Sequence, residues 1–346
     1  MNAKHLLLAS LALVACSKPP ADKKPAAGKK EAEAPVDAGV NHGKFASSIK
    51  AARESLEKQP CDKKLSLQLG DYYNRAADYK GAVAWVDEFE AKCEKWPRLT
   101  WVKFSACKEL EDWACATAVG TGLIENDPTD SDYWWWRGEV EEKAGKHVLA
   151  KADYLQSMAN KPTGYPANRF SKWAEEKASR PCDGALMIQW WIDQGKRTDE
   201  DWIDPAVKRL FLAGKCTKLA GKGKTTIAVS EKSPINKVKV KVDSASGTFL
   251  FDPQSGQTSV TPEFAKKAKL TAGTDRVGFM AAGKLMDGLL APVKKLEIGG
   301  ASALELDVAV VEGLPEGFDG VLGLSTLMQF QVKRTPKAWQ LSAISK

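Results

Sequence analysis

Three evenly spaced alanines constrain the fold of this chain more than any other feature. Ala82, Ala116 and Ala150 follow one another at intervals of 34 residues. Gly70 and Gly138 each precede one of these alanines by 12 residues, and the apolar residues around them recur at helical spacing. Internal periods of roughly 20–50 residues are typical of repeat architectures, in which small residues allow close helix packing. The sequence therefore predicts stacked pairs of helices.

The pattern resembles the tetratricopeptide repeat, a family of stacked helical hairpins. Two positions depart from it, because Ser66 stands where the family has a large apolar residue and Phe104 where it has glycine. A looser fourth unit is expected at 170–191, followed by a helix near 205–212. The resemblance implies an α-helical array over residues 44–216 whose groove binds a protein or peptide ligand.

Two interpretations of the adjacent tryptophans remain open. Trp134, Trp135 and Trp136 form part of a binding wall in the groove, or they belong to the core. Three consecutive residues cover most of the circumference of a helix, so at least one of them must face the core. Trp190 and Trp191 allow the same two interpretations.

The N-terminus has the features of an export signal. A charged start is followed by an apolar stretch from Leu6 to Val14, too short to span a membrane as a helix. The segment Leu13-Val14-Ala15-Cys16 resembles the lipobox of bacterial lipoproteins. This resemblance implies that residues 1–16 are a signal peptide, that Cys16 is acylated, and that the acyl chains insert in a lipid bilayer of the bacterial cell envelope. No aspartate follows the cysteine, which favours the outer membrane.

Residues 17–43 are rich in Pro, Ala, Lys and Glu and contain no aromatic residue. Such a segment cannot bury enough apolar surface to fold, so we expect a disordered tether.

Six further cysteines remain in the exported chain. An even number of cysteines in an oxidising compartment predicts disulfides, here three. Fifteen pairings are possible, and the expected helix pattern brings two pairs together at the ends of helical hairpins. The expected bonds are Cys61 with Cys93, Cys107 with Cys115 and, by what remains, Cys182 with Cys216. With only three histidines and no C-x-x-C pair, neither a metal site nor a cofactor is expected.

The composition changes after Cys216. β-Branched residues alternate with polar ones at 226–229 and 238–242, which predicts half-buried antiparallel strands. Residues 217–346 carry 18 basic and 12 acidic side chains, so 18 − 12 = +6 of the net charge of +7 lies there. This charge attracts acidic partners or an anionic membrane, or it belongs to solvated lysines on exposed strand faces. Nucleic acid is not an expected partner, because the exported chain does not meet it.

Three motifs in this region occur in a meaningful order. A predicted hairpin over 238–252 ends at Asp252, a helix start follows at Thr261-Pro262, and Asp319-Gly320-Val321-Leu322-Gly323 comes later. Residues 225–346 thereby resemble the retropepsin-like aspartic proteases. The resemblance implies a mainly antiparallel β barrel, a flap over 278–289 with its turn at Ala281, Ala282 and Gly283, and paired strands at 296–300 and 308–311.

The catalytic turn departs from the family pattern. The family has Asp, Thr or Ser, and Gly, whereas this chain has Asp252-Pro253-Gln254. A shifted alignment keeps Ser255-Gly256 but places Gln254 at the position of the aspartate. Catalysis in the family needs two aspartates that share a proton. Since no second motif occurs, an active site at Asp252 requires a homodimer formed through the β domain.

The leading functional hypothesis is an envelope lipoprotein that acts as a protein or peptide interaction scaffold, with an inactive retropepsin-like domain at 217–346. The first alternative is a homodimeric aspartic endopeptidase that uses Asp252. The second alternative is a structural lipoprotein that binds cell wall or anionic lipid.

Overall fold

The structure is a computed structural model, and it describes residues 40–162, 164–178, 180–193, 209, 221–229 and 236–343. The predicted signal peptide and nearly all of the predicted tether lie outside these residues. So do Cys216 and, except for Arg209, the helix expected near 205–212. Within the part of the chain that the structure describes, no helix is both long and apolar enough to cross a membrane.

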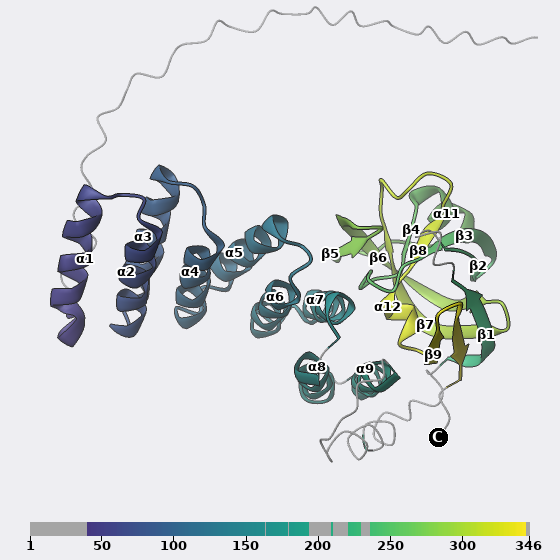
Figure 1. Ribbon diagram of the computed structural model, residues 1–346. Helices are drawn as coiled ribbons and strands as arrows, with labels where there is room; N and C mark the ends of the chain where they lie inside the picture. Colours follow the sequence, from purple (N-terminus) through teal and green to yellow (C-terminus); the bar gives the residue numbers. More distant parts are fainter. Residues whose placement is uncertain are drawn as a thin grey trace, which may run out of the picture. The chain divides into compact units, whose positions relative to one another are not determined.

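Nine α-helices form a row of antiparallel hairpins in the described N-terminal half (Figure 1). A short 3-10 turn at Gly43–Phe45 leads into α1. The bounds of the helices are α1 Ala46–Lys58, α2 Lys63–Arg75, α3 Tyr79–Lys92, α4 Pro97–Glu109, α5 Trp113–Asn126, α6 Ser131–Lys143, α7 His147–Asn160, α8 Gly164–Glu176 and α9 Pro181–Asp193.

Aspartates begin four of these helices. Asp62, Asp78, Asp112 and Asp130 each precede a helix, and each carboxylate accepts a hydrogen bond from a backbone N–H of the first turn. Such a cap satisfies a donor that has no partner inside the helix and is worth about 1 kcal/mol. The boundaries of the hairpins are therefore encoded locally.

The small residues of the 34-residue period lie at helix contacts, as the repeat pattern predicts. Ala82, Ala116 and Ala150 are fully buried. A Cβ atom added to Gly70 would lie 2.8 Å from Val102 Cγ1, and one added to Gly138 would lie 2.7 Å from Tyr154. These distances are too short for any larger residue. The array is tetratricopeptide-like.

The two departures from the repeat pattern are accommodated locally. Phe104 is fully buried, and space for its ring comes from Gly120 on the following helix, where an added Cβ would lie 3.3 Å from Phe104 Cε2. Ser66 is also buried. Its hydroxyl donates to the Asp62 carbonyl, and its own carbonyl accepts a bond from Trp85 Nε1.

Disulfides bind the helical hairpins at their ends. Cys61 is bonded to Cys93 and Cys107 to Cys115, with Cα atoms 5.6 and 5.8 Å apart. These are two of the three predicted pairs. Cys182 is also disulfide-bonded, and the cysteine predicted to pair with it lies outside the described residues.

Most of the adjacent tryptophans belong to the core. Trp134 and Trp135 are buried, as are Trp190 and Trp191, and Trp134 Nε1 donates to the Pro128 carbonyl. Trp136 is only partly buried. Its ring contacts that of Trp101, with the ring centroids 3.6 Å apart and the ring planes tilted by 33°. Only this member of the triplet remains available to a ligand.

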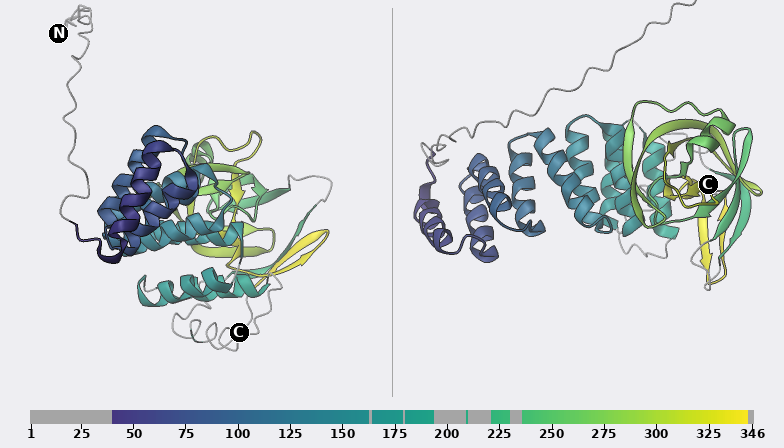
Figure 2. Two further views of the ribbon diagram at one scale, coloured as in Figure 1. Left: turned by 60° about the vertical axis from the view of Figure 1, so that its left-hand side comes forward. Right: turned by 90° about the horizontal axis from the view of Figure 1, so that it is seen from above.

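The C-terminal part is a β barrel, seen nearly end on in the right panel of Figure 2. Its strands and helices are β1 Lys222–Ala228, β2 Lys237–Val242, β3 Ala245–Phe251, β4 Ser259–Val260, α11 Pro262–Ala268, β5 Arg276–Ala281, β6 Lys284–Ile298, β7 Ala301–Val310, β8 Gly320–Leu322, α12 Leu324–Leu327, β9 Gln331–Thr335 and β10 Ala338–Ser342.

The strands are ordered β5-β6-β2-β3-β8-β4-β7-β1-β10-β9, and a further pairing of β6 with β7 closes a ring. The pairs β3–β8 and β4–β7 are parallel and the other pairs are antiparallel. Closure pairs the strands of this ring on both sides, whereas β5 and β9 stand at the two ends of the strand order among the described strands.

One local expectation was wrong, because the turn of the hairpin over 238–252 was expected to span residues 243–247. The β2–β3 turn consists of only Asp243 and Ser244, because Asp243 adopts a left-handed φ of 46° that permits a tight turn. The segments predicted at 296–300 and 308–311 belong to β6 and β7, which are paired as expected. Residues 296–298 and 308–310 lie at different places along this hairpin. The former pair with residues 301–303, and Val308 pairs with Ala291.

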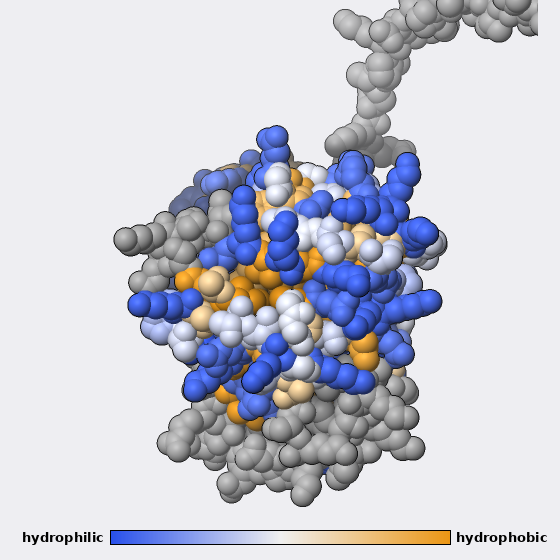
Figure 3. Space-filling model, turned by 90° about the vertical axis from the view of Figure 1, so that its right-hand side faces the viewer, coloured by the Kyte–Doolittle hydropathy of each residue, from blue (hydrophilic) through white to orange (hydrophobic). Residues whose placement is uncertain are grey.

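The exposed outer face of β2 is basic. Lys237, Lys239 and Lys241 are exposed, whereas the valines between them are buried. Figure 3 shows the corresponding side of the molecule, where hydrophobic surface at the centre is surrounded by hydrophilic side chains. Solvated lysines on an exposed strand therefore account for part of the positive charge of this region.

The last helices of the array share one hydrophobic core with the barrel. The rings of Trp190 and Trp339 lie 6.2 Å apart, and the Arg334 guanidinium lies 3.8 Å above the Trp339 ring. Burial there lowers the pKa of Arg334 to about 10. The Val332 N–H donates to the Asp193 carboxylate at 2.7 Å. The array and the barrel therefore pack as one unit.

A buried ion pair near this junction predicts a pH dependence. Lys151 and Arg180 lie 3.0 and 2.6 Å from the Asp183 carboxylate. Burial alone raises the pKa of Asp183, but the two cations outweigh burial and hold its pKa below the usual value. Stability from such a group is complete above its unfolded pKa of about 3.9 and is lost as the pH falls through the folded pKa.

We therefore expect Asp183→Asn to be about 3 kcal/mol less stable than the native chain at pH 7, with a difference that shrinks below about pH 4. Urea denaturation at both pH values measures the difference. Asp71→Asn, on the exposed face of α2, is the control and should change little at either pH. A difference that stays constant between pH 7 and pH 3 would contradict this interpretation.

Candidate functional site

Strand β3 carries Asp252 to the edge of the barrel. Its last residues pair with β2 on one side and with β8 on the other. The chain leaves the strand at Asp252, whose N–H donates to the Leu322 carbonyl at 3.2 Å. Asp252 is partly exposed. The carboxylate therefore lies at the end of a strand that is paired on both sides, and part of the residue is open to solvent.

Both carboxylate oxygens of Asp252 accept hydrogen bonds from the chain itself. Oδ1 accepts the N–H of Gln254 at 3.1 Å, within the turn. Oδ2 accepts the N–H of Ala282 at 2.9 Å. Ala282 belongs to the β5–β6 hairpin, so the predicted flap lies against the predicted catalytic aspartate.

The flap candidates form a two-residue turn. Ala281 ends β5 and is fully buried, while Ala282 and Gly283 have left-handed φ values of 52° and 74°. This conformation matches the twist of the flanking strands. It also directs the Ala282 N–H to Asp252. The structure thus brings together Asp252 and the flap turn, which the sequence could only associate by resemblance.

The residues after Asp252 form a buried polar loop. Ser255 is fully buried, and its hydroxyl donates to the Gln257 carbonyl at 2.7 Å. The loop is joined to α12 by two backbone bonds, from the Leu324 N–H to the Ser255 carbonyl and from the Ser325 N–H to the Gly256 carbonyl. Ser255 and Gly256 therefore support the loop. In the alignment that uses them as the Ser-Gly pair, the position of the catalytic aspartate is still occupied by Gln254.

Hydroxyl groups also fix this loop. Thr258 Oγ1 accepts the Gly323 N–H at 3.0 Å and lies 2.8 Å from Thr326 Oγ1. The Thr258 N–H donates to Ser325 Oγ at 2.9 Å. All four residues are buried. The loop after Asp252 is therefore held by hydroxyl groups of its own chain, those of Thr258, Ser325 and Thr326.

Gln156 of α7 is the residue of this site that the sequence analysis missed. It is fully buried, and its Oε1 accepts the N–H of Gly256 at 2.8 Å and that of Met280 at 2.7 Å. Its Nε2 donates to the Gln254 carbonyl at 3.0 Å. One side-chain amide thus joins the helical array to both the Asp252 loop and the flap strand.

Gly256 is the position that allows this contact. A Cβ atom added to it would lie 2.7 Å from both the N and the Cα of Gln156. Only glycine permits the loop to lie so close to a helix backbone. The glycine of the Ser-Gly pair was visible in the sequence, but nothing there associated it with a helix 100 residues earlier.

The site contains one carboxylate of the expected kind. Within the described ranges, no second aspartate is hydrogen-bonded to Asp252, and no group of three or more His, Cys, Asp or Glu side chains is placed to hold a metal ion. A carboxylate that already accepts two N–H groups can stabilise the turn. It forms a proton-sharing dyad only with a second carboxylate.

Other predicted residues fall elsewhere. Four of the six cysteines brace the array far from Asp252, and Cys16 lies outside the described residues. Trp136 lies on α6, where its ring contacts that of Trp101 of α4. Trp136 and Trp101 form no hydrogen bond to Asp252 among the described residues, whereas Tyr133 packs against the cluster that contains Met280 of β5.

Comparisons with known proteins find similarity to both parts of the chain. The chain is similar to the protein in "Crystal structure of MamA", with 16% identity and a TM-score of 0.37 over 50% of this chain and 91% of that one. It is also similar to a retropepsin-like aspartic protease from Rickettsia conorii, with 18% identity and a TM-score of 0.27 over 36% of this chain and 94% of that one. No curated protein matches the chain. Residues 238–326, from β2 to α12, match the family described as aspartyl protease.

Proposed function

We propose that this protein is a lipid-anchored scaffold of the bacterial cell envelope, in which the helical array binds a protein or peptide and the retropepsin-like barrel does not cleave. The observation that carries the proposal is the position of Gln156. Its amide bonds to the Asp252 loop and to the flap strand of its own chain. A substrate peptide would have to displace α7 to reach these groups.

The turn at Asp252 supports the absence of cleavage. Pro253 has neither a hydroxyl nor a backbone N–H, and Gln254 has a side chain where the family has glycine. The Ala282 N–H of the closed flap already donates to the carboxylate. α7 packs on β5 and α12, so it occupies a side of the barrel next to the Asp252 loop.

Partly exposed aromatic residues support ligand binding by the array. The rings of Trp101 and Trp136 are in contact, and the ring centroids of Tyr133 and Trp136 lie 5.6 Å apart. These residues come from α4 and α6, which hold the same position in successive hairpins. Aromatic side chains offer a large contact area at little conformational cost.

The anchor is proposed from the lipobox alone. Acylation of Cys16 would hold the chain on a membrane, because two or more acyl chains give stable attachment. Metabolic labelling with a fatty acid tests this step. Label should enter the native chain and not Cys16→Ser, and the variant should leave the membrane fraction.

The second candidate function is a homodimeric aspartic endopeptidase. It is favoured by the position of Asp252, which lies at the end of β3 directly beneath the flap turn. This function requires α7 to move away from the barrel and a second chain to bring its own Asp252 alongside.

Digestion of a mixed peptide library over an acidic pH range, read by mass spectrometry, separates the two candidates. The full chain should leave the library intact at every pH, as should Asp252→Asn. Asp287→Asn, on the exposed arm of the flap hairpin, is the matched control. Cleavage by the native chain and by Asp287→Asn, lost in Asp252→Asn, would establish the protease and refute the scaffold proposal.

A further inference from the structure

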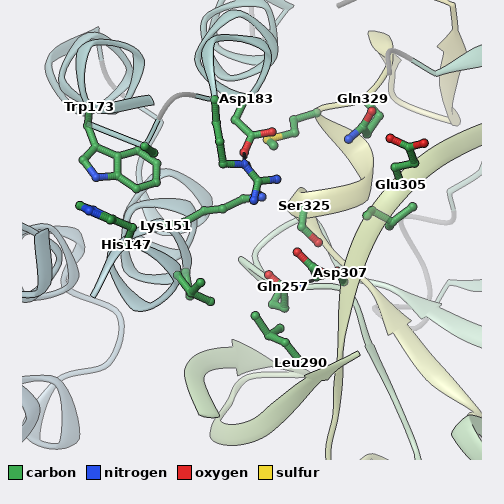
Figure 4. A pocket seen from close by; sticks show the side chains of 16 residues that line it. His147, Lys151, Trp173, Asp183, Gln257, Leu290, Glu305, Asp307, Ser325 and Gln329 are labelled. Carbon is green, nitrogen blue, oxygen red and sulfur yellow. Dashed lines mark hydrogen bonds and ion pairs between the residues drawn. The ribbon is translucent and has the colours of Figure 1, made fainter. Parts of the chain in front are cut away.

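A cavity lies between the helical array and the barrel (Figure 4). One wall comes from α7, α8 and α9, and the other from β6, β7 and α12. Its volume is about 100 Å³. A cavity that holds one water has a volume of roughly 10–15 Å³ when volume is measured with a water-sized sphere. By the same measure, this cavity has room for a small molecule of several non-hydrogen atoms.

The wall formed by the array carries excess positive charge. Lys151 and Arg180 both pair with Asp183, at 3.0 and 2.6 Å. Two cations share this one carboxylate, and both contacts are to the same oxygen, Oδ2. Two positive charges thus face one negative charge, which leaves a net charge of +1 on these three side chains. An anionic group in the cavity would meet two hydrogen-bond donors with favourable charge.

The wall formed by the barrel carries negative charge. Glu305 and Asp307 of β7 line it, and neither forms an ion pair with another described residue. Glu305 has a left-handed φ of 51°, and it stands between the paired residues Leu304 and Leu306 without a partner of its own. Such a conformation is unfavourable for glutamate, so the surrounding strand must impose it.

Buried polar atoms on this lining also need a partner. Gln329 is 6% exposed, and its Oε1 accepts no hydrogen bond from any described residue. The amide lies at the barrel side of the cavity in Figure 4. His147 Nδ1 and Trp173 Nε1, on the array side, are likewise buried without a partner in the described chain. Buried polar atoms left in this state are rare in proteins and call for a partner.

We propose that this cavity binds a small zwitterion of the α-amino acid class. The carboxylate would lie against Lys151 and Arg180, and the ammonium group against Glu305 and Asp307. The Gln329 amide oxygen would accept a further N–H of the ligand. A molecule with a single charge can form an ion pair with only one of the two walls. Both charges are therefore needed for affinity.

The position of the site gives binding a consequence for the whole chain. Lys151 and Gln156 lie on the same helix, α7, five residues apart. A ligand held between the two walls adds contacts across the junction that Gln156 already forms. Ligand binding would therefore stabilise the docked arrangement of array and barrel. The inference stands apart from the proposed scaffold function, because it concerns neither Asp252 nor the aromatic surface.

Isothermal titration calorimetry on the full chain tests the inference. The probes are glycine and alanine, acetate and methylammonium as singly charged controls, and 4-aminobutyrate, in which the two charges lie farther apart. We expect an α-amino acid to bind at least tenfold more tightly than either singly charged molecule. Asp307→Asn and Lys151→Met should each weaken binding at least tenfold.

Matched controls come from exposed residues outside the cavity. Glu312→Gln and Lys143→Met remove the same charges and should leave the affinity within twofold of the native value. Thermal unfolding of each variant establishes that it folds. The inference is overturned if no α-amino acid binds, if acetate or methylammonium binds equally well, or if binding survives both Asp307→Asn and Lys151→Met in folded protein.

Discussion

Replacing Gln156 by leucine is expected to lower the free energy of unfolding by about 3–5 kcal/mol, because two buried backbone N–H groups lose their partner at about 1–3 kcal/mol each and one part-buried carbonyl loses its donor. The groups are the N–H of Gly256, the N–H of Met280 and the carbonyl of Gln254. Leucine fills nearly the same volume but offers no hydrogen bond. Guanidinium denaturation followed by tryptophan fluorescence measures the change.

Gln68→Leu is the control for this prediction. Gln68 lies on the exposed face of α2, and among the described residues its side chain donates a hydrogen bond to the Tyr72 hydroxyl. The same chemical change there should cost less than about 0.5 kcal/mol. Equal effects of the two substitutions would mean that the Gln156 amide does not hold the array on the barrel.

Replacing Arg137 by methionine is expected to cost about 3–5 kcal/mol, because it leaves a buried carboxylate without its cation. Arg137 makes two bonds to Asp153, at 2.8 and 2.6 Å, and a third to Thr121 Oγ1 at 3.1 Å. The side chains of Arg137 and Asp153 are only 13% and 3% exposed. The pair connects α6 with α7, the helix that carries Gln156.

A double substitution separates loss of the pair from loss of one partner. Arg137→Met combined with Asp153→Leu should be markedly more stable than Arg137→Met alone, because no unpaired charge remains. Arg169→Met is the matched surface control. Arg169 is 48% exposed and pairs with Glu139, so its replacement should cost less than about 1 kcal/mol. A small effect of Arg137→Met would show that water reaches Asp153.

The fold was largely accessible from local patterns. The 34-residue spacing of alanines predicted the helical hairpins, and the alternating valines of β2 predicted a half-buried strand. Both patterns are visible because a regular element repeats its buried positions at a fixed period. The pairing of Cys61 with Cys93 followed from the same reasoning, since antiparallel helices bring their outer ends together.

The site was accessible only in part. Asp252 and the flap turn were predicted by resemblance to a family, and the structure places them in hydrogen-bonding contact. The tight turn at Asp243 was missed, because a left-handed backbone at a residue other than glycine has no clear signature in the sequence. The space for Phe104 was also missed. Its compensating glycine, Gly120, lies on a different helix.

The sequence by itself determined the helical repeat, the alternating strands at 226–229 and 238–242, and the loop that carries the aspartate. Only the tertiary structure decided that α7 enters the Asp252 site and that Lys151 and Asp307 line one cavity. The physical reason is the separation along the chain of the residues that interact. Caps, periodic burial and turns depend on neighbours within a few residues, whereas the bond from Gly256 to Gln156 joins residues 100 positions apart. Such a contact depends on how two complete domains pack against each other. The sequence around a buried glutamine therefore does not indicate which residues it will bond to.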